Sequence, residues 1–290
     1  MIAGMSSSVI WGLILLVWAL FSLYVAQKRR WFSIGISVRE FPFSARQFFV
    51  VGASLVFAIG IYLVAFKFAR GLTIALQQTP LSVSFETYTV SDWTILEHVC
   101  GLIFSGIGLS LLVSLLPIDL LPIVMGKNTG WKKWCNGALV GFLVFPIVMV
   151  ATNVVAMIVA KIAPHARADQ EALSLLTHVD RYSLLVYLLS GTIVFIVPFV
   201  EEFLFRGFLQ GFLGGIVHPM LTIVLTSVAF AMFHYSPLQR ASNIEIVLGL
   251  FVYSLFASSL RAKESSVMAA VGMHTAFNAL ALVSFFILRG

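Results

Sequence analysis

Charged residues are scarce in this chain: they make up 10% of its 290 residues, whereas 60% are hydrophobic. Soluble domains are about a quarter charged, so this shortage argues against a water-soluble fold. Apolar runs of about 20 residues, long enough to cross a membrane, recur with short gaps, and the mean hydropathy is +1.02. We therefore expect a multi-pass integral membrane protein in which residues 1–290 form a single domain.

Cysteine and several catalytic signatures are equally sparse. Cys100 and Cys135 fit no zinc or redox spacing, and we interpret both as packing residues. The chain contains no His-Glu-x-x-His zinc motif, no Gly-x-Ser-x-Gly nucleophile elbow and no Gly-x-Gly-Asp motif of aspartyl enzymes. Glu97-His98 has half of the zinc motif but lacks the second histidine. We interpret this pair as interfacial, because it lies near the start of an apolar run.

Basic residues outnumber acidic ones and give a net charge of +6. They stand in short clusters at the ends of apolar runs, as at Lys28-Arg29-Arg30 and Lys132-Lys133. Such clusters are typical of topology signals and of contact with anionic lipid. We therefore expect membrane lipid, and no nucleic acid, as a partner.

Hydropathy predicts an all-α protein with about eight transmembrane helices, four of them within residues 1–182. The predicted spans are 9–26, 47–66, 94–116, 136–160, 184–210, 219–235, 245–260 and 266–288. The fifth apolar stretch runs from Ser183 to Val217, which at about 1.5 Å per residue exceeds a hydrocarbon core of about 30 Å. We expect it to tilt, to protrude or to kink at Pro198.

Two adjacent glutamates and an arginine lie inside this fifth stretch, at Glu201, Glu202 and Arg206. A charged group in hydrocarbon costs between about 2.5 and more than 10 kcal/mol, so such residues persist mainly where partners and a function hold them. Residues four apart share a helix face, and Glu202 is therefore expected to pair with Arg206. Glu201 points about 100° away, where it is available as a general base.

Two later spans contribute further polar groups. His234 ends one apolar run, while His274 and Asn278 lie four residues apart on one helix face. Glutamate and histidine can deprotonate a water molecule, and an imidazole with an amide can donate to an oxyanion. Glu201, His234 and His274 are equally compatible with three ligands of a zinc ion. A third interpretation is a buried polar network that only holds helices together.

A shared site requires these groups at one depth in the membrane. If the fifth span begins at Ser183, Glu201 lies toward one membrane face and His234 toward the other. A break at Pro198, which would make residues 199–217 the true span, removes this mismatch.

Three glycines follow the glutamates at intervals of four residues, at Gly207, Gly211 and Gly215. Small residues at this spacing allow helices to approach closely. We expect this face to help bring the glutamates to the histidine-bearing helices.

The three motifs occur together in a characteristic order: Glu-Glu-x-x-x-Arg from Glu201, Phe-x-x-x-His ending at His234, and His-x-x-x-Asn from His274. This ordered set resembles the CAAX protease and bacteriocin-processing (CPBP) family, which includes the type II CAAX prenyl endopeptidases. The resemblance covers the C-terminal third and marks residues 183–290 as the catalytic core. Residues 1–182 carry none of the family's motifs.

The resemblance implies an eight-helix intramembrane endopeptidase that cleaves a membrane-associated or lipidated peptide. The roles that it implies are water activation by Glu201 and His234 and oxyanion stabilisation by His274 and Asn278, with Glu202 and Arg206 in support. Prenylated CAAX proteins and bacteriocin-type peptides are both substrates that the family name covers, and nothing in the sequence selects between them.

The family has been described both as metalloproteases and as glutamate proteases. We favour the mechanism without a metal cofactor, because the His-x-x-x-Asn helix offers an imidazole and an amide where an oxyanion needs donors. The alternative is zinc-dependent hydrolysis with Glu201, His234 and His274 as ligands. From other classes, a transporter or a non-catalytic scaffold would also place carboxylates and histidines in the membrane, although the chain has neither an inverted repeat nor paired broken helices.

Overall fold

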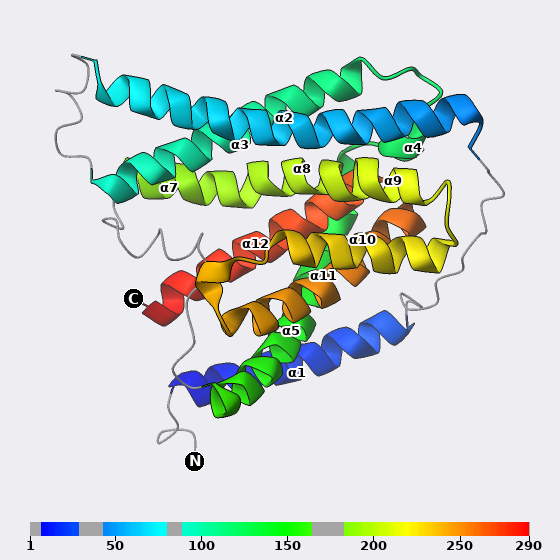
Figure 1. The fold of residues 1–290 in the computed structure, drawn as a ribbon. Helices are drawn as coiled ribbons and strands as arrows, with labels where there is room; N and C mark the ends of the chain where they lie inside the picture. Colours follow the sequence, from blue (N-terminus) through cyan, green and yellow to red (C-terminus); the bar gives the residue numbers. More distant parts are fainter. Residues whose placement is uncertain (1–6, 29–42, 80–88, 164–182, 290) are drawn as a thin grey trace.

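The computed structural model of the protein describes residues 7–28, 43–79, 89–163 and 183–289. Over these residues the chain forms helices and turns without a β-strand, which confirms the all-α prediction, and each predicted apolar segment is helical (Figure 1). The first five helices are α1 (Ser7–Lys28), α2 (Ala45–Gln77), α3 (Val90–Ser114), α4 (Leu121–Val124) and α5 (Trp131–Ile162). The last three long ones are α10 (Pro219–Phe233), α11 (Ser242–Glu264) and α12 (Val267–Arg289), with a short 3₁₀ turn, η4 (Pro237–Gln239), before α11.

Between α5 and α10 lies one continuous helix, Leu184–Leu213, which we call the composite helix. Its consecutive parts are α7 (Leu184–Gly191), the π-helical η2 (Thr192–Ile196), α8 (Val197–Glu202), the π-helical η3 (Phe203–Leu209) and α9 (Gln210–Leu213). Ser183 begins it as the N-cap, since its hydroxyl accepts from the amide of Val186.

In the part of the chain that the structure describes, six helices are long and apolar enough to cross a membrane: α2, α3, α5, the composite helix, α11 and α12. Within the described residues, two further apolar helices are shorter, Gly12–Lys28 and Pro219–Phe233. These findings confirm an integral multi-pass membrane protein, but they do not confirm the predicted count of eight spans. α10 has 15 residues, and its length of about 22 Å is less than a hydrocarbon core of about 30 Å.

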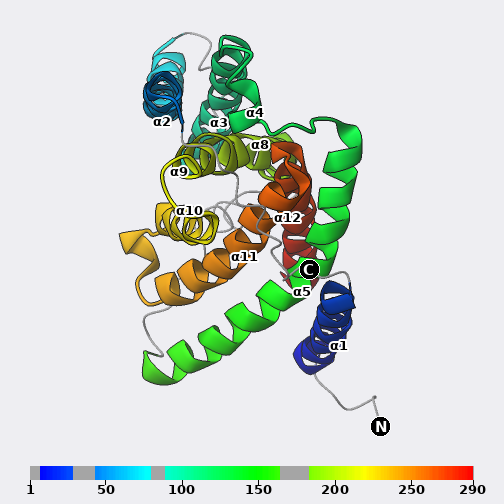
Figure 2. The same cartoon turned by 90° about the vertical axis from the view of Figure 1, so that its right-hand side faces the viewer.

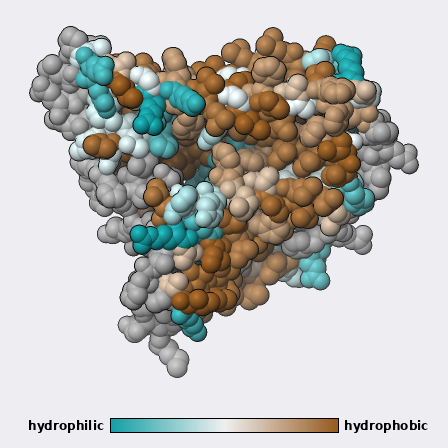
Figure 3. All heavy atoms as spheres, viewed as in Figure 1, coloured by the Kyte–Doolittle hydropathy of each residue, from teal (hydrophilic) through white to brown (hydrophobic). Residues whose placement is uncertain are grey.

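The surface agrees with a lipid environment. Phe49, Val56 and Phe57 of α2 are each about two-thirds exposed or more, and Figure 3 shows hydrophobic residues over much of the described part of one face. Lys28 ends α1, and Lys132 with Lys133 lies in the first turn of α5, so these basic residues flank apolar helices as predicted. Arg29 and Arg30 of the first cluster lie outside the described residues.

The composite helix lies between two groups of helices. α2 and α3 pack along each other on one side of it, while α10, α11 and α12 contact its other side (Figures 1 and 2). α5 packs against α11 and α12, and α1 packs against α5. The central position of the composite helix explains why its charged residues are buried.

Glycines let α5 and α12 approach each other closely. A Cβ atom on Gly137 of α5 would meet the backbone oxygen of Ala269, and one on Gly272 of α12 would meet the backbone oxygen of Trp134. The two helix backbones are therefore in direct contact, as small residues at membrane helix crossings permit. This crossing positions the turn of α12 that carries His274.

The glycine face of the composite helix has a main partner other than the one predicted. A Cβ on Gly207 would lie 3.3 Å from Val124 Cγ1, and one on Gly211 would lie 2.9 Å from the backbone oxygen of Ile123. Gly215 faces the ring of Phe43. Gly207 and Gly211 mainly contact α4, and only Gly207 also meets a histidine-bearing helix, since its Cβ would lie 3.8 Å from Val267 Cγ2 on α12.

The predicted break at Pro198 was also wrong. The helix continues through Pro198 because η2 precedes it: the amide of Val197 bonds to the carbonyl of Thr192, five residues earlier instead of four. Such a π turn adds one residue to the helix and adjusts its register just where a proline lacks its amide hydrogen. The polar residues after Pro198 thus remain part of one long span.

Candidate active site

The structure places the Glu201 carboxylate between two imidazoles from different helices. Nε2 of His234 lies 3.6 Å from Oε1 of Glu201, and Nε2 of His274 lies 4.0 Å from Oε2. Glu201 and His274 are buried, whereas the side chain of His234 is 26% exposed. The cluster is therefore accessible from the side of His234.

His234 comes to this position because α10 is short. His234 directly follows α10, about 22 Å from the beginning of that helix at Pro219. Glu201 lies about 18 Å back from the end of the composite helix at Leu213. The short connection 214–218 joins these two ends, so both side chains lie at a similar depth. The length of α10, and not a break at Pro198, removes the mismatch in depth.

The orientation of the His234 ring follows from one backbone contact. Its Nδ1 lies 2.9 Å from the carbonyl oxygen of Phe230, one turn earlier. A carbonyl oxygen only accepts, so Nδ1 carries a hydrogen, and in the neutral imidazole Nε2 presents a lone pair. That lone pair is on the nitrogen nearest Glu201.

Glu202 differs from its neighbour in having one carboxylate oxygen that accepts from three donors. Its Oε1 accepts from Nη1 of Arg206 at 3.1 Å, from Nδ1 of His274 at 2.8 Å and from the hydroxyl of Tyr253 at 3.4 Å. Both Glu202 and Arg206 are 0% exposed. The predicted pairing of Glu202 with Arg206 is present in the structure.

Arg206 joins this network to two further helices. Its Nη2 donates to Oγ of Ser254 on α11 at 2.7 Å. Its guanidinium carbon lies 4.2 Å from the centre of the Phe230 ring on α10, a cation–π distance. The buried charge is thus balanced by a carboxylate, a hydroxyl and an aromatic face.

His274 connects the two glutamates. With Nδ1 donating to Glu202, its Nε2 is directed toward Glu201. A histidine held by a carboxylate on one nitrogen has a fixed tautomer and a fixed ring orientation. Glu202 therefore orients the imidazole that faces Glu201.

Asn278 lies one turn beyond His274, and its amide nitrogen donates to the carbonyl oxygen of Ile193 at 2.8 Å. Ile193 belongs to η2. After the bond from the Val197 amide to the Thr192 carbonyl, the backbone hydrogen bonds again join residues four apart. The next carbonyl, that of Ile193, then receives no backbone amide. Asn278 supplies the missing donor, so its described bond is to the composite helix and not to Glu201.

The second π segment repeats this arrangement. The amide of Gln210 bonds to the carbonyl of Phe205, five residues earlier, and the carbonyl of Arg206 is then passed over. Nε of Arg261 on α11 donates to that oxygen at 3.1 Å. Each π segment therefore has one carbonyl that receives a side chain from a neighbouring helix, and α8 with both glutamates lies between the two segments.

Two buried carboxylate oxygens have no hydrogen-bond partner among the described residues: Oε2 of Glu201 and Oε2 of Glu202. Buried polar atoms are normally bonded to a partner, so an unpaired oxygen in a cluster with an open side is available to water or substrate. The oxygen of Glu201 is the one that faces the second imidazole.

The described residues contain no group of three His, Cys, Asp or Glu side chains arranged to hold a metal ion. Glu201, His234 and His274 share a site, yet as placed they do not have the arrangement of zinc ligands.

Sequence reasoning missed three contributors to the site: Tyr253, Ser254 and Arg261, all on α11. A tyrosine or serine in an apolar helix carries no pattern that links it to a charge 48 or more positions earlier. Arg261 lies in the last turn of α11, where a basic residue is ordinary. Only the fold shows that it points inward.

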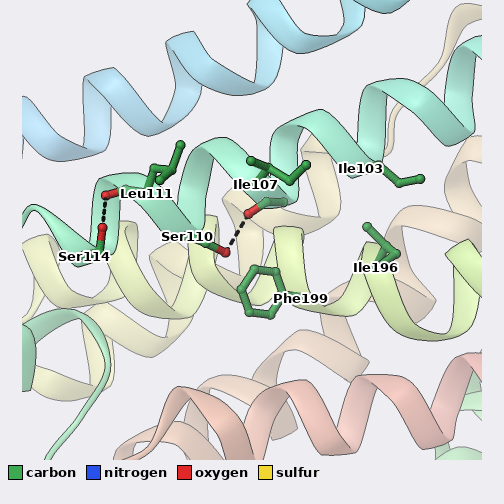
Figure 4. Close-up of a pocket in the computed structure, with 8 residues that line it drawn as sticks. Ile103, Ile107, Ser110, Leu111, Ser114, Ile196 and Phe199 are labelled. Carbon is green, nitrogen blue, oxygen red and sulfur yellow. Dashed lines mark hydrogen bonds between the residues drawn. The ribbon is translucent and has the colours of Figure 1, made fainter.

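A separate apolar groove of about 490 Å³ runs between α3 and the composite helix, lined by Ile103, Ile107, Ile196 and Phe199 among others (Figure 4). Ser110 and Ser114 in its wall bond to carbonyl oxygens of their own helix. Phe199 precedes Glu201 by two residues, and side chains at that spacing point to nearly opposite helix faces. The groove is therefore distinct from the glutamate site. The described hydrogen bond of His98 is to the carbonyl of Thr94 on its own helix, α3, and not to the glutamate site.

Fold and site together define a polytopic helical membrane protein with a buried glutamate–histidine centre. Residues 183–280 match the family model described as Rce1-like, type II CAAX prenyl endopeptidase. The match covers the composite helix, α10, α11 and the first part of α12, and it makes this part of the chain similar to a family of peptidases. The chain matched no curated protein and no solved structure.

Proposed function

We propose that this protein is an intramembrane endopeptidase in which Glu201 and His234 activate the water that attacks a peptide bond. The observation that carries the proposal is the environment of Glu201. One carboxylate oxygen lies 3.6 Å from Nε2 of His234, and the other is buried without a hydrogen-bond partner in the described chain. Glu202, which we interpret as structural, also has a buried Oε2 without a partner, but its Oε1 accepts from three donors.

The pair of Glu201 and His234 has the acceptors that a nucleophilic water needs. With Nδ1 of His234 donating to Phe230, Nε2 and the carboxylate are both acceptors, and two acceptors do not bond to each other. One water can donate a hydrogen to each of them, which leaves an oxygen lone pair for attack. As that oxygen bonds to the substrate carbonyl carbon, its proton passes to Glu201. The same proton then goes to the leaving amine.

The developing oxyanion needs donors on the other side of the substrate carbonyl. His274 in its imidazolium form donates from Nε2, while Glu202 holds Nδ1 and stabilises the positive charge. Asn278 is the second donor: its amide nitrogen has two hydrogens, and the bond to Ile193 uses one of them. That bond also fixes the plane of the amide.

Glu202 and Arg206 support this chemistry without touching the substrate. Both are 0% exposed, so no substrate atom reaches them. Their ion pair fixes the acceptor for His274. Enclosure in protein also keeps the charges from lipid, where each would cost several kcal/mol.

The substrate that best fits is a hydrophobic or lipidated peptide delivered through the membrane. Glu201 and His274 lie within helices long and apolar enough to cross a membrane, and the accessible side of the cluster is that of His234. The matched family model is described by its prenylated CAAX substrates, which makes a prenylated peptide the first to test.

Hydrolysis of a fluorogenic prenylated peptide by the purified protein in lipid nanodiscs tests the proposal. Glu201→Gln and His234→Ala are expected to lower kcat at least about a thousandfold, as loss of the acid–base apparatus does. The matched controls are Glu97→Gln and His98→Ala on α3, where His98 makes the same contact to the carbonyl four residues earlier. Turnover that survives in both site variants would reject the assignment.

A further inference from the structure

Arg261 is a buried charged residue that the reaction described above does not use. It lies in the last turn of α11 and is 7% exposed. Its Nε donates to the carbonyl oxygen of Arg206 at 3.1 Å, and its Nη2 donates to the carbonyl oxygen of Ile123 at 2.6 Å. One guanidinium thus bridges the composite helix and α4.

Nε of Arg261 contacts the carbonyl oxygen of Arg206, which receives no backbone amide in η3. An unpaired carbonyl inside a protein costs about as much as a lost hydrogen bond, so the π turn needs an outside donor to persist. If η3 reverted to α-helical spacing, the residues after Glu202 would rotate by about 100° relative to it. The side chains of Arg206 and Gln210 would then lose their contacts with α11.

α11 contacts the composite helix at regular intervals that depend on this register. Arg206 donates to Ser254, and Nε2 of Gln210 donates to the carbonyl oxygen of Ser258 at 3.0 Å. Arg261, three residues after Ser258, contacts the carbonyl oxygen of Arg206. The contacts reach the site through Arg206, which holds Glu202, which in turn holds His274.

We propose that Arg261 is a positioning residue: it fixes the register of η3 and thereby keeps Arg206 and Glu202 in place to orient His274. This inference rests on the proposed function for its kinetic consequence. Arginine suits the position because its planar group presents donors in fixed directions to two carbonyls, whereas a lysine ammonium is a single compact donor.

The test compares Arg261→Met with Lys263→Met, an exposed basic residue two positions further along the same helix turn. Turnover of the prenylated peptide and backbone hydrogen exchange over residues 203–213 are measured for both variants and the wild type. Arg261→Met is expected to lower kcat about tenfold or more with KM within about twofold, since misplaced catalytic groups lose rate more than binding. Exchange is expected to rise in 203–213 first, while Lys263→Met matches the wild type.

Arg261→Lys keeps the charge and one donor nitrogen, so an intermediate kcat is expected for this variant. If Arg261→Met does not fold, Arg261→Lys is compared with the wild type instead. Equal kcat for Arg261→Met and Lys263→Met would overturn the inference. Exchange that rises equally in all helices would overturn it too, because it would show general destabilisation. If the wild type itself does not cleave the peptide, the proposed function fails, while the exchange comparison still decides whether Arg261 holds η3.

Discussion

Nδ1 of His274 donates a hydrogen bond to Oε1 of Glu202 at 2.8 Å. This bond couples two residues that belong to motifs 72 positions apart and turns Nε2 of His274 toward Glu201. Adjacent glutamates thereby acquire opposite roles. Oε1 of Glu202 accepts from three donors, whereas Glu201 lies beside His234, the more exposed imidazole of the cluster.

Substitution of the two glutamates by glutamine is expected to separate stability from activity. Glu202→Gln leaves the buried guanidinium of Arg206 without its charge partner, and breaking a buried pair in this way costs about 3–5 kcal/mol. Glu201→Gln keeps the fold and removes turnover. Thermal unfolding in nanodiscs, with activity measured in parallel, checks this. Equal losses of stability in both variants would contradict the division of roles.

Much of this fold follows from composition alone, because apolar runs of membrane length have few structures available to them. Ser183 as the start of the fifth helix and the segments at 219–233 and 267–289 lie within a few residues of the predicted limits. The pairing of Glu202 with Arg206 likewise follows from helical periodicity.

The features that sequence could not supply are those set by contacts between helices. Helix spacing treats residues after Pro198 as an ordinary α-helix, so the two π turns were invisible, and so were their donors Asn278 and Arg261. The glycine spacing correctly predicted a close contact but not its partner, α4. Hydropathy predicted a full span over 219–235, whereas α10 is a 15-residue helix with His234 as its C-cap. An apolar run does not show where its helix ends.

Ser254→Ala is expected to weaken the support of Arg206. The change leaves one buried guanidinium donor without its acceptor at 2.7 Å, and an unsatisfied buried donor costs about 1–3 kcal/mol. A several-fold lower kcat should accompany the loss of stability, because Arg206 then holds Glu202 less rigidly. Ser110→Ala is the matched control, since its hydroxyl is exposed and bonds only within α3. Unchanged stability and kcat in Ser254→Ala would show that the contact is dispensable.

Metal dependence is expected to be absent. Turnover should persist after dialysis against a strong chelator, and elemental analysis of active protein should find far less than one zinc per chain. This follows from the proposed roles of Glu201 and His234, whose acceptors face a water and not a cation. Activity that is lost with the chelator and restored by stoichiometric zinc would assign Glu201, His234 and His274 as ligands instead.

Gly272→Ala is expected to damage the site from a distance by separating α5 from α12. The added Cβ would meet the backbone oxygen of Trp134, which cannot move independently of its helix, and such overpacking costs about 1–3 kcal/mol. His274 lies two residues further along α12, so its distance from Glu201 should change and kcat should fall with stability. Gly60→Ala on α2, where a Cβ meets nothing within 4 Å, is the matched control and should be neutral or slightly stabilising, by up to about 1 kcal/mol. If both alanine variants behave alike in unfolding and in turnover, direct contact between the α5 and α12 backbones does not position His274.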